Sequence, residues 1–351
     1  MKRREFIKTL SISAGLNGAA FPTWAGGGKK ESSVQPIGGS WFEFQHCWPY
    51  ESEYWDAACA AFTCDQWRIK IREMAELGIQ YLVLLSVAQD GKTFYPSKHF
   101  PRWNLNCEDP LEAVFSEADV QGSKIFVSSG FFDEKIGVLA DAEGVKKRFQ
   151  AMAELVECYG RHESFYGWYW PNEASLKPYF HDSFMTYCNQ SSEEARKLTP
   201  QAKILIAPYG TRYTQNDAQF IRQLENLNVD IIAYQDEVGV RKTRVDQLEG
   251  IFSRLRKIHD QVPQISLWAD MEIFSFQKEV YKSNLLPAPF PRIEGQLKSL
   301  SPYVDKILVY QYLGMMNKPG TPAHAGHSSS TRLYANYARW RRRLKQKAAA
   351  G

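Results

Sequence analysis

Eight short apolar runs, separated by stretches with apolar residues at helical spacing, constrain the fold of this chain more than any other feature of its sequence. The runs cover residues 41–45, 81–87, 124–128, 166–170, 203–207, 230–234, 264–269 and 306–310. Short apolar runs bounded by polar and turn residues are typical of buried strands. Strands that alternate with helices predict parallel pairing through right-handed crossovers.

The segments between the runs predict helices. Trp67, Ile71, Met74 and Leu77 repeat at helical spacing before Gly78, which is a typical residue to end a helix. Later segments with the same spacing cover residues 149–159, 184–198, 218–227, 245–262, 293–300 and 331–344. The pattern therefore predicts an α/β protein in which strand and helix alternate throughout.

Eight such units favour a single-domain (β/α)8 TIM barrel over residues 39–345. A doubly wound sheet is the alternative. It is disfavoured because no GxGxxG follows the first strand and no GxxxxGK[ST] occurs in the chain. In a TIM barrel the carboxyl ends of the strands form one face, where the active site is built.

The N-terminus has the composition of a targeting segment. Arg3 and Arg4 precede an apolar pair, and a modestly hydrophobic stretch follows over residues 10–20. This resembles a twin-arginine signal peptide, here residues 1–25, which implies a bacterial protein exported through the twin-arginine translocon to the periplasm or medium. A leader at 26–38 and a disordered tail at 346–351 complete the predicted organisation, and no other stretch reaches the length of a membrane span.

Charge and cysteine content narrow the function further. The formal net charge is +4, and the first 25 residues hold four basic residues and one acidic residue, so the remaining chain is close to neutral. A near-neutral body argues against nucleic acid as a partner. None of the six cysteines forms a CxxC pair, which excludes a zinc ribbon. Cys47, Cys59, Cys64 and Cys107 lie in loop-like sequence and predict one or two disulfides of open pairing, whereas Cys158 and Cys188 are expected as buried thiols.

Acids, amides and aromatic residues gather where the predicted strands end. Asn172-Glu173 follows the fourth strand, and Glu272 follows the seventh. Glycosidic cleavage uses two carboxyl groups, one protonated to assist the leaving oxygen and one ionised to attack carbon or activate water. Strands four and seven lie roughly across the barrel, so we predict that Glu173 and Glu272 form this pair, at a separation that suits a retaining mechanism.

Further residues at the strand ends are predicted to bind a sugar. Asp270 shares a strand face with Glu272, so it is either an alternative nucleophile or a group that tunes Glu272. Asp236 and Glu237 are substitutes if Glu272 is not the nucleophile. Hydroxyl-binding groups are expected at His46, Asn172, Tyr209, Tyr234, Gln235, Asp236 and Asp270. Sugar platforms are expected at Trp48, Trp103, Trp168, Trp170 and Trp268. The alternatives are packing in the core for the aromatic residues and a structural role for His46.

Three segments carry a family resemblance. Residues 167–173 (GWYWPNE), 232–239 (IAYQDEVG) and 267–272 (LWADME) resemble the DUF4434 family, a little-characterised bacterial group associated with glycoside hydrolysis. The positions of Asn172-Glu173 and Glu272 are also similar to the acid/base and nucleophile positions of the retaining (β/α)8 glycoside hydrolases. The resemblance implies an enzyme that acts on an oligo- or polysaccharide without a cofactor.

Other chemistries find less support in the sequence. His324 and His327 lack the helical context of a zinc protease, so no metal site is predicted. A serine hydrolase is disfavoured because GxSxG is missing. The alternatives kept open are a carbohydrate-binding barrel without catalysis and, after it, a metal-dependent barrel hydrolase.

Overall fold

The structure, a computed structural model, describes residues 34–130 and 142–350, with side chains through Lys347. The predicted signal peptide and residues 26–33 of the predicted leader lie outside the described residues. The α9 helix (Ser330–Ala350) includes residues 346–350, for which the sequence analysis expected a disordered tail.

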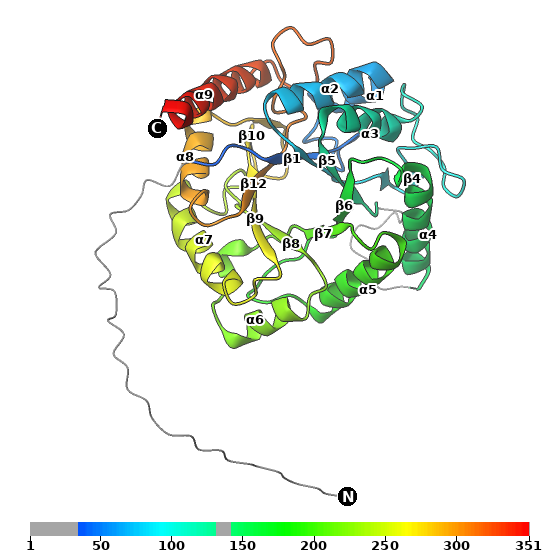
Figure 1. The fold of residues 1–351 in the computed structure, drawn as a ribbon. Coiled ribbons are helices and arrows are strands. Elements are labelled where there is room, and N and C mark those ends of the chain that lie inside the picture. The colour runs from blue at the N-terminus through cyan, green and yellow to red at the C-terminus, as the bar shows by residue number, and fades with distance from the viewer. Residues whose placement is uncertain (1–33, 131–141, 351) are drawn as a thin grey trace, which may run out of the picture. The chain divides into compact units, whose positions relative to one another are not determined.

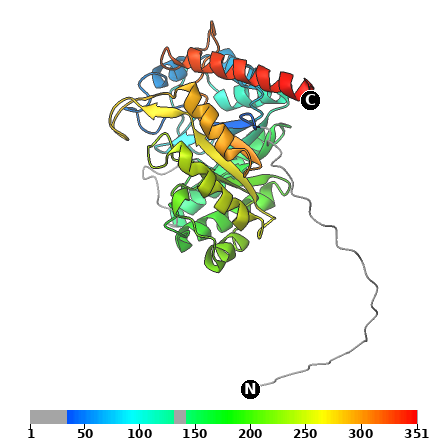
Figure 2. The same ribbon diagram turned by 90° about the vertical axis from the view of Figure 1, so that its left-hand side faces the viewer.

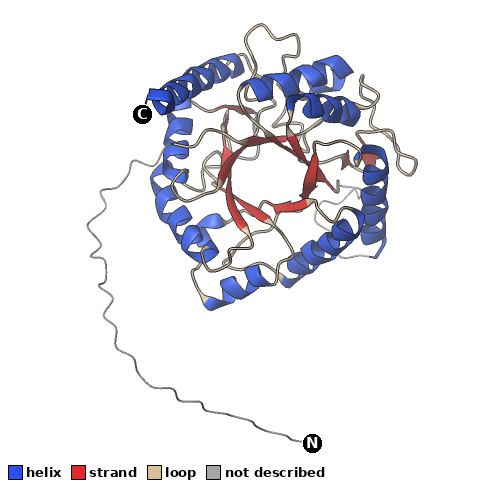
Figure 3. Cartoon of the chain, in the orientation of Figure 1, coloured by secondary structure: helices blue, strands red, loops and turns tan. Residues whose placement is uncertain are grey.

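Eight parallel strands close into a barrel (Figures 1 and 3), which confirms the predicted TIM barrel. Around the barrel the order is β1-β12-β9-β8-β7-β6-β5-β2. Their bounds are β1 (Gly39–Phe42), β2 (Tyr81–Leu84), β5 (Lys124–Ser128), β6 (Phe165–Tyr169), β7 (Lys203–Ile206), β8 (Ile231–Gln235), β9 (Ser266–Glu272) and β12 (Lys306–Tyr310). Each strand overlaps one predicted apolar run.

Helices surround the barrel (Figure 3), because each crossover buries the apolar stripe of its helix against the strands. They are α2 (Cys64–Glu76), α3 (Pro110–Gln121), α4 (Ala142–Tyr159), α5 (Asp182–Leu198), α6 (Ala218–Glu225), α7 (Val245–His259), α8 (Phe290–Leu300) and α9. Helix α3 was not among the predicted helices, although its signals are present. Asp109 caps it by accepting from the Glu112 N–H at 2.9 Å, and Pro110 is its first residue.

Alternation along the strands divides the core into two layers. On β9, Trp268 belongs to the cluster that fills the barrel interior, while Leu267, Ala269 and Met271 belong to the layer under the helices. Because successive strand residues point to opposite faces, Asp270 and Glu272 continue the inward side of Trp268. This alternation directs two acidic side chains to the interior of the barrel mouth.

Short elements decorate the loops: α1 (Asp56–Ala61), η1 (Thr211–Tyr213), the β3 (Ala88–Gln89)–β4 (Lys92–Thr93) pair and the β10 (Phe274–Phe276)–β11 (Leu285–Pro287) hairpin. The hairpin directly follows β9 and projects from one end of the barrel in the side view of Figure 2. It is tied to the loop after β1, because the Leu285 N–H donates to the Glu51 carbonyl at 2.9 Å. These loops therefore build one connected rim at the carboxyl ends of the strands.

One disulfide joins Cys64, at the start of α2, to Cys107 in the loop before α3. The prediction of one or two bridges in this group is confirmed with this pairing, and Cys47 and Cys59 are free within the described chain. Cys188 is buried as predicted, while Cys158 is half-buried. Over residues 34–130 and 142–350, no helix is both long enough and apolar enough to cross a bilayer.

Candidate active site

A cavity of about 500 Å³ opens at the carboxyl ends of the barrel strands. Its walls come from the residues that follow β1, β2, β6, β7, β8, β9 and β12, and from the β10–β11 hairpin with its loop. The lining residues are His46, Cys47, Trp48, Glu51, Leu85, Pro171, Asn172, Glu173, Tyr209, Gln235, Val240, Lys242, Asp270, Glu272, Phe274, Phe276, Tyr281, Leu285 and Tyr310. A concave site with apolar walls and several polar groups is the usual form of a ligand pocket.

Asp270 is a buried carboxyl in this cavity without a protein partner. Its side chain is 3% exposed, and Oδ1 accepts no hydrogen bond from any described residue. Burial raises the pKa of Asp270 well above its usual value, and the nearby charges of Glu173 and Glu272 raise it further. Burial and these neighbours therefore favour the protonated form of Asp270.

Glu272 is held in place by the backbone of the loop after β8. Its Oε2 accepts a hydrogen bond from the Val240 N–H at 2.8 Å, and its side chain is 5% exposed. A Cβ on Gly239 would lie 2.9 Å from the same oxygen and 2.8 Å from the backbone carbonyl oxygen of Phe274, so a larger residue would force the backbone to shift. Burial, and after it the charge of Asp236, raises the pKa of Glu272 to about 8.

Glu173 lies in the segment after β6 and is accessible from the cavity, while protein surrounds it on its other sides. Desolvation by this surrounding protein raises the pKa of Glu173 to about 7, against a hydrogen bond from Gln235 and the charge of Lys242, which both lower it. A carboxyl with this pKa holds and releases a proton near neutrality, as a general acid/base must.

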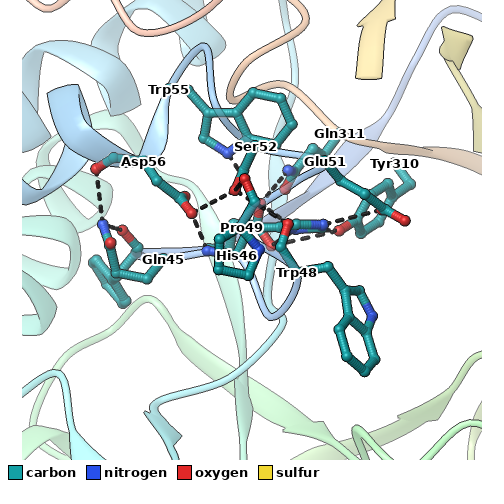
Figure 4. Close-up of polar contacts among 12 residues, drawn as sticks. Gln45, His46, Trp48, Pro49, Glu51, Ser52, Trp55, Asp56, Tyr310 and Gln311 are labelled. Carbon is teal, nitrogen blue, oxygen red and sulfur yellow. Dashed lines mark hydrogen bonds and ion pairs between the residues drawn. The ribbon is translucent and has the colours of Figure 1, made fainter. Parts of the chain in front are cut away.

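His46 lies between two carboxylates on another wall of the cavity, and Figure 4 shows it near Glu51 and Tyr310. Its Nδ1 lies 3.0 Å from both oxygens of Glu43, and its Nε2 lies 3.2 Å from Glu51 Oε2. Burial disfavours the charged imidazole, but Glu43 and Glu51 outweigh it and raise the pKa of His46 to about 10. The ring is thus an imidazolium that donates from both nitrogens.

Glu43 organises the base of this wall. It accepts hydrogen bonds from Trp55 Nε1 at 3.3 Å, from the Tyr310 hydroxyl at 3.4 Å and from Gln311 Nε2. The sequence analysis missed Glu43 and Glu51. The inward direction of Glu43 can be inferred from the sequence, because Glu43 stands two residues after Trp41, whose side chain faces the barrel interior.

Asp236, which the sequence predicts to bind substrate, lies outside the cavity lining that the described residues form. Its Oδ1 accepts from the N–H groups of Glu272 and Val238, both at 3.1 Å, and its Oδ2 accepts from Gln296 Nε2 at 2.6 Å. Asp236 therefore positions the backbone of Glu272 from behind. Burial raises its own pKa to about 6.

Trp168, one of the predicted sugar platforms, donates to Thr199 Oγ1 at 2.8 Å. Four more of the predicted aromatic contacts also lie outside the cavity lining that the described residues form. Trp170 donates to Ser192 Oγ at 3.1 Å, and the Tyr234 hydroxyl is hydrogen-bonded to His259 Nε2 at 3.1 Å, both under the helices. Trp268 is buried in the barrel interior, where its ring lies 5.2 Å from that of Tyr81.

Trp103 packs on Phe94 with ring centroids 5.9 Å apart, and it donates to the Gln89 carbonyl at 3.0 Å. None of these four rings belongs to the cavity lining that the described residues form. All four therefore fit the alternative prediction, which is packing in the core.

The cavity does bring together the predicted residues His46, Trp48, Asn172, Glu173, Tyr209, Gln235, Asp270 and Glu272. The structure adds Glu51, Lys242, Tyr281 and Tyr310, which come from loops or from a strand end that the sequence analysis did not single out. In the part of the chain that the structure describes, no group of three His, Cys, Asp or Glu side chains is arranged to hold a metal ion.

The fold and the cavity together define a (β/α)8 barrel protein with a carboxyl-rich site at the C-terminal end of its strands. The chain belongs to the DUF4434 family, a domain of unknown function, whose family model matches residues 37–323. No curated protein matches the sequence.

Solved structures share the fold at low sequence identity. A "putative alpha-L-fucosidase" from Bacteroides thetaiotaomicron VPI-5482 has a TM-score of 0.69 and 17% identity, over 89% of this chain and 96% of that one. Beta-galactosidases from Halorubrum lacusprofundi and Marinomonas ef1 have TM-scores of 0.58 and 0.57 with 11% and 10% identity, over 89% and 90% of this chain. The chain spans about three fifths of each of these galactosidases, with 58% and 60% of their lengths covered.

Proposed function

We propose that this protein is a glycoside hydrolase that cleaves a glycan by a retaining mechanism, with Glu173 as acid/base and Glu272 as nucleophile. The observation that carries the proposal is the grouping of Glu173, Asp270 and Glu272 in one cavity, each with a raised pKa. Carboxyl groups with shifted pKa values, placed together in a cleft, are typical of acid/base chemistry.

In the proposed reaction, the protonated Glu173 donates its proton to the glycosidic oxygen as the bond to the anomeric carbon breaks. The ionised Glu272 attacks that carbon and forms a glycosyl-enzyme. Glu173, now ionised, takes a proton from water, which displaces Glu272 from the anomeric carbon. Glu173 is therefore protonated again at the end of the cycle.

The mouth of the cavity supports a sugar as the ligand. Trp48 and Tyr281 line it with 50% and 46% of their surfaces exposed, and Tyr50 lies beside Trp48 with ring centroids 6.1 Å apart. Exposed aromatic rings next to polar groups suit the apolar faces and the hydroxyls of a pyranose. Asp270, with its unpartnered oxygen, is proposed to bind a substrate hydroxyl.

One observation favours a second candidate, a carbohydrate-binding barrel without turnover. The pKa of Glu272 is raised to about 8, so much of the population holds Glu272 protonated at neutral pH, and a protonated carboxyl cannot attack carbon. If the protein is an enzyme, the reactive molecules are those in which Glu272 is ionised and Glu173 is protonated. Both readings predict sugar binding, and only the first predicts hydrolysis.

The deciding experiment is release of reducing ends from a panel of plant, algal and bacterial glycans, with thermal stabilisation by the same glycans measured in parallel. Hydrolysis by the wild type that is missing from the Glu272→Gln variant supports the enzyme. Stabilisation without hydrolysis by any preparation supports the binding protein. If the panel gives neither, the proposed function is wrong.

Export through the twin-arginine translocon to the periplasm or medium is part of the same proposal. The Cys64–Cys107 disulfide supports it, because structural disulfides persist mainly in oxidising compartments. Replacing Arg3 and Arg4 together by lysine is expected to leave full-length protein in the cytoplasm, whereas the exported wild type should begin near Gly26. An exported protein that still begins at Met1 would contradict the proposed signal peptide.

A further inference from the structure

Lys242 places a positive charge in the wall of the cavity. It lies in the loop after β8, a few residues beyond Val240, which holds Glu272. Burial opposes its charged form, but Tyr281, Glu237 and Glu272 raise the pKa of Lys242 above its usual value. The ammonium group is therefore charged at every pH at which the protein is expected to work.

The charge of Lys242 is only partly compensated by its neighbours. Its Nζ lies 3.7 Å from Glu237 Oε1, and Arg212 Nη1 lies 3.4 Å from the same oxygen. Glu237 Oε2 accepts from the Gly210 N–H at 3.1 Å. One carboxylate thus serves two cations, which leaves one net positive charge in this group, and Lys242 is the cation that reaches the cavity.

Two aromatic rings flank the ammonium group inside the cavity. Lys242 Nζ lies 5.4 Å from the ring centroid of Tyr209 and 5.3 Å from that of Tyr281, and both rings are cavity-lining. Such rings hold a cation in position and exclude water from its sides. A cation that is partly dehydrated and incompletely paired is a good partner for an anionic group of a ligand.

We propose that Lys242, flanked by Tyr209 and Tyr281, binds an anionic substituent of the sugar, so that the substrate is an acidic glycan carrying a carboxylate or a sulfate. This inference rests on the proposed function, because it assigns a substrate class to the same cavity. The subsite lies close to the cleavage point, since the charge of Lys242 acts on both Glu173 and Glu272.

The other charges of the cavity are compatible with an anion at this position. Burial favours the neutral form of Asp270, and His46 balances one of the two carboxylates beside it, so the group of His46, Glu43 and Glu51 keeps one net negative charge on another wall of the cavity. Glu173 and Glu272 also hold protons over part of the neutral range. Lys242 is then the cation in the described lining that is left for a ligand.

The test compares matched aryl glycosides that differ only at the sixth carbon: glucosides with glucuronides, galactosides with galacturonides, and each neutral sugar with its 6-sulfate, in both anomers. We expect the wild type to have a higher kcat/KM for an acidic member than for its neutral partner. In Lys242→Gln this ratio should fall by about 10–100-fold, the worth of a charge-assisted hydrogen bond. Lys242→Arg should restore part of the ratio, and the uronide and sulfate arms identify the anion.

A matched control is Lys98→Gln, which removes the same charge from an exposed pair with Glu157 outside the cavity lining. We expect it to leave the acidic-to-neutral ratio unchanged. An equal loss on acidic and neutral substrates in Lys242→Gln, or a wild type that prefers neutral sugars, would overturn the inference while leaving the hydrolase intact.

A second measurement separates this inference from the proposed function. Binding of glucuronate, galacturonate and inorganic sulfate is measured by calorimetry with wild type, Lys242→Gln and Lys98→Gln. Binding that only Lys242→Gln weakens supports the anionic subsite even if no glycoside is cleaved, which would count against the hydrolase alone. If none of the three anions binds and no acidic glycoside is preferred, the subsite is refuted.

Discussion

Two regions of this barrel bury a carboxyl group to the same extent and surround it in opposite ways. Glu73 in α2 is 3% exposed, and its Oε2 accepts from Lys70 Nζ at 2.9 Å and from the Tyr312 hydroxyl at 3.1 Å. Asp270 on β9 is also 3% exposed, but the charges that act on its pKa are those of other carboxyl groups, first of all Glu173 and Glu272. The charge of Glu73 is compensated by a lysine, whereas Asp270 lies among other acidic side chains.

The difference separates structural burial from functional burial. Lys70 also donates to Asn317 Oδ1 at 2.8 Å, so the pair at Glu73 anchors the long segment after β12 to helix α2. The electrostatic environment of Asp270 lowers the stability of the fold, so selection for stability alone would not retain this arrangement. Such a site is expected to store a proton and to gain its missing partner from a ligand.

The largest expected effect concerns the two proposed catalytic acids. Glu272→Gln should be inactive on every substrate, since no glycosyl-enzyme forms without the nucleophile. Glu173→Gln should lose roughly 10²–10⁴-fold on a natural glycan, the usual worth of general acid catalysis, yet lose less when an activated aryl group leaves. Kinetics on both substrate types measure this difference. Near-wild-type turnover by both variants would remove these residues from the mechanism, and activity in Glu272→Gln that Asp270→Asn abolishes would move the nucleophile to Asp270.

The next effect is on stability at the compensated site. Glu73→Gln leaves Lys70 buried without its counter-charge and should lower the free energy of unfolding by about 3–5 kcal/mol. Glu76→Gln, three residues further along α2, removes the charge from an exposed pair with Lys318 and should cost less than about 1 kcal/mol. Urea denaturation of the two variants provides the measurement. Equal losses would mean that Glu73 is not the structural ion pair described above.

A smaller effect of opposite sign is expected at Asp270. Folding raises the pKa of Asp270. The stability that its protonated form contributes is therefore lost as the pH rises from the pKa of Asp270 in the unfolded chain toward its pKa in the folded protein. Asp270→Asn cannot ionise, so at pH 8 it should be more stable than the wild type, by about 1.4 kcal/mol for each unit by which folding raises the pKa of Asp270, up to the pH of the measurement. The gain should shrink toward pH 5. A variant that is less stable than the wild type at pH 8 would show that Asp270 has a stabilising partner.

The smallest effect is on the pH profile. Reaction requires Glu173 protonated and Glu272 ionised, so kcat/KM should be greatest between the two pKa values of about 7 and about 8. On either side it should fall about tenfold per pH unit, as expected for loss of one required protonation state. Glu173→Gln should keep the acid limb and lose the alkaline fall. An alkaline fall that persists in this variant would assign it to another group.

The sequence predicted the carboxyl-rich site better than its aromatic surroundings. Glu173, Asp270 and Glu272 were chosen from their position after strands, and all three line the cavity. The sequence analysis predicts that Tyr234, Gln235 and Asp236 all bind substrate, although consecutive residues of a strand cannot all face one side. Gln235 lines the cavity, so its two neighbours face away from it.

Much of the fold was determined by the sequence alone. The order of apolar runs and amphipathic segments specifies a closed parallel barrel, because a parallel strand pair needs a covering crossover and eight of them complete a ring. The acids Glu173 and Glu272 were identifiable because strand ends in a barrel share one face.

What only the tertiary structure decided is the partnership of each side chain. Whether a buried acid meets a lysine, as Glu73 does, or other acids, as Asp270 does, depends on segments that are distant in the chain. Lys242 and Glu51 reach the cavity because the loops after β8 and β1 fold over the barrel mouth. Alternation along a strand shows which residues share a face, but loop packing in three dimensions sets the charge that each one meets.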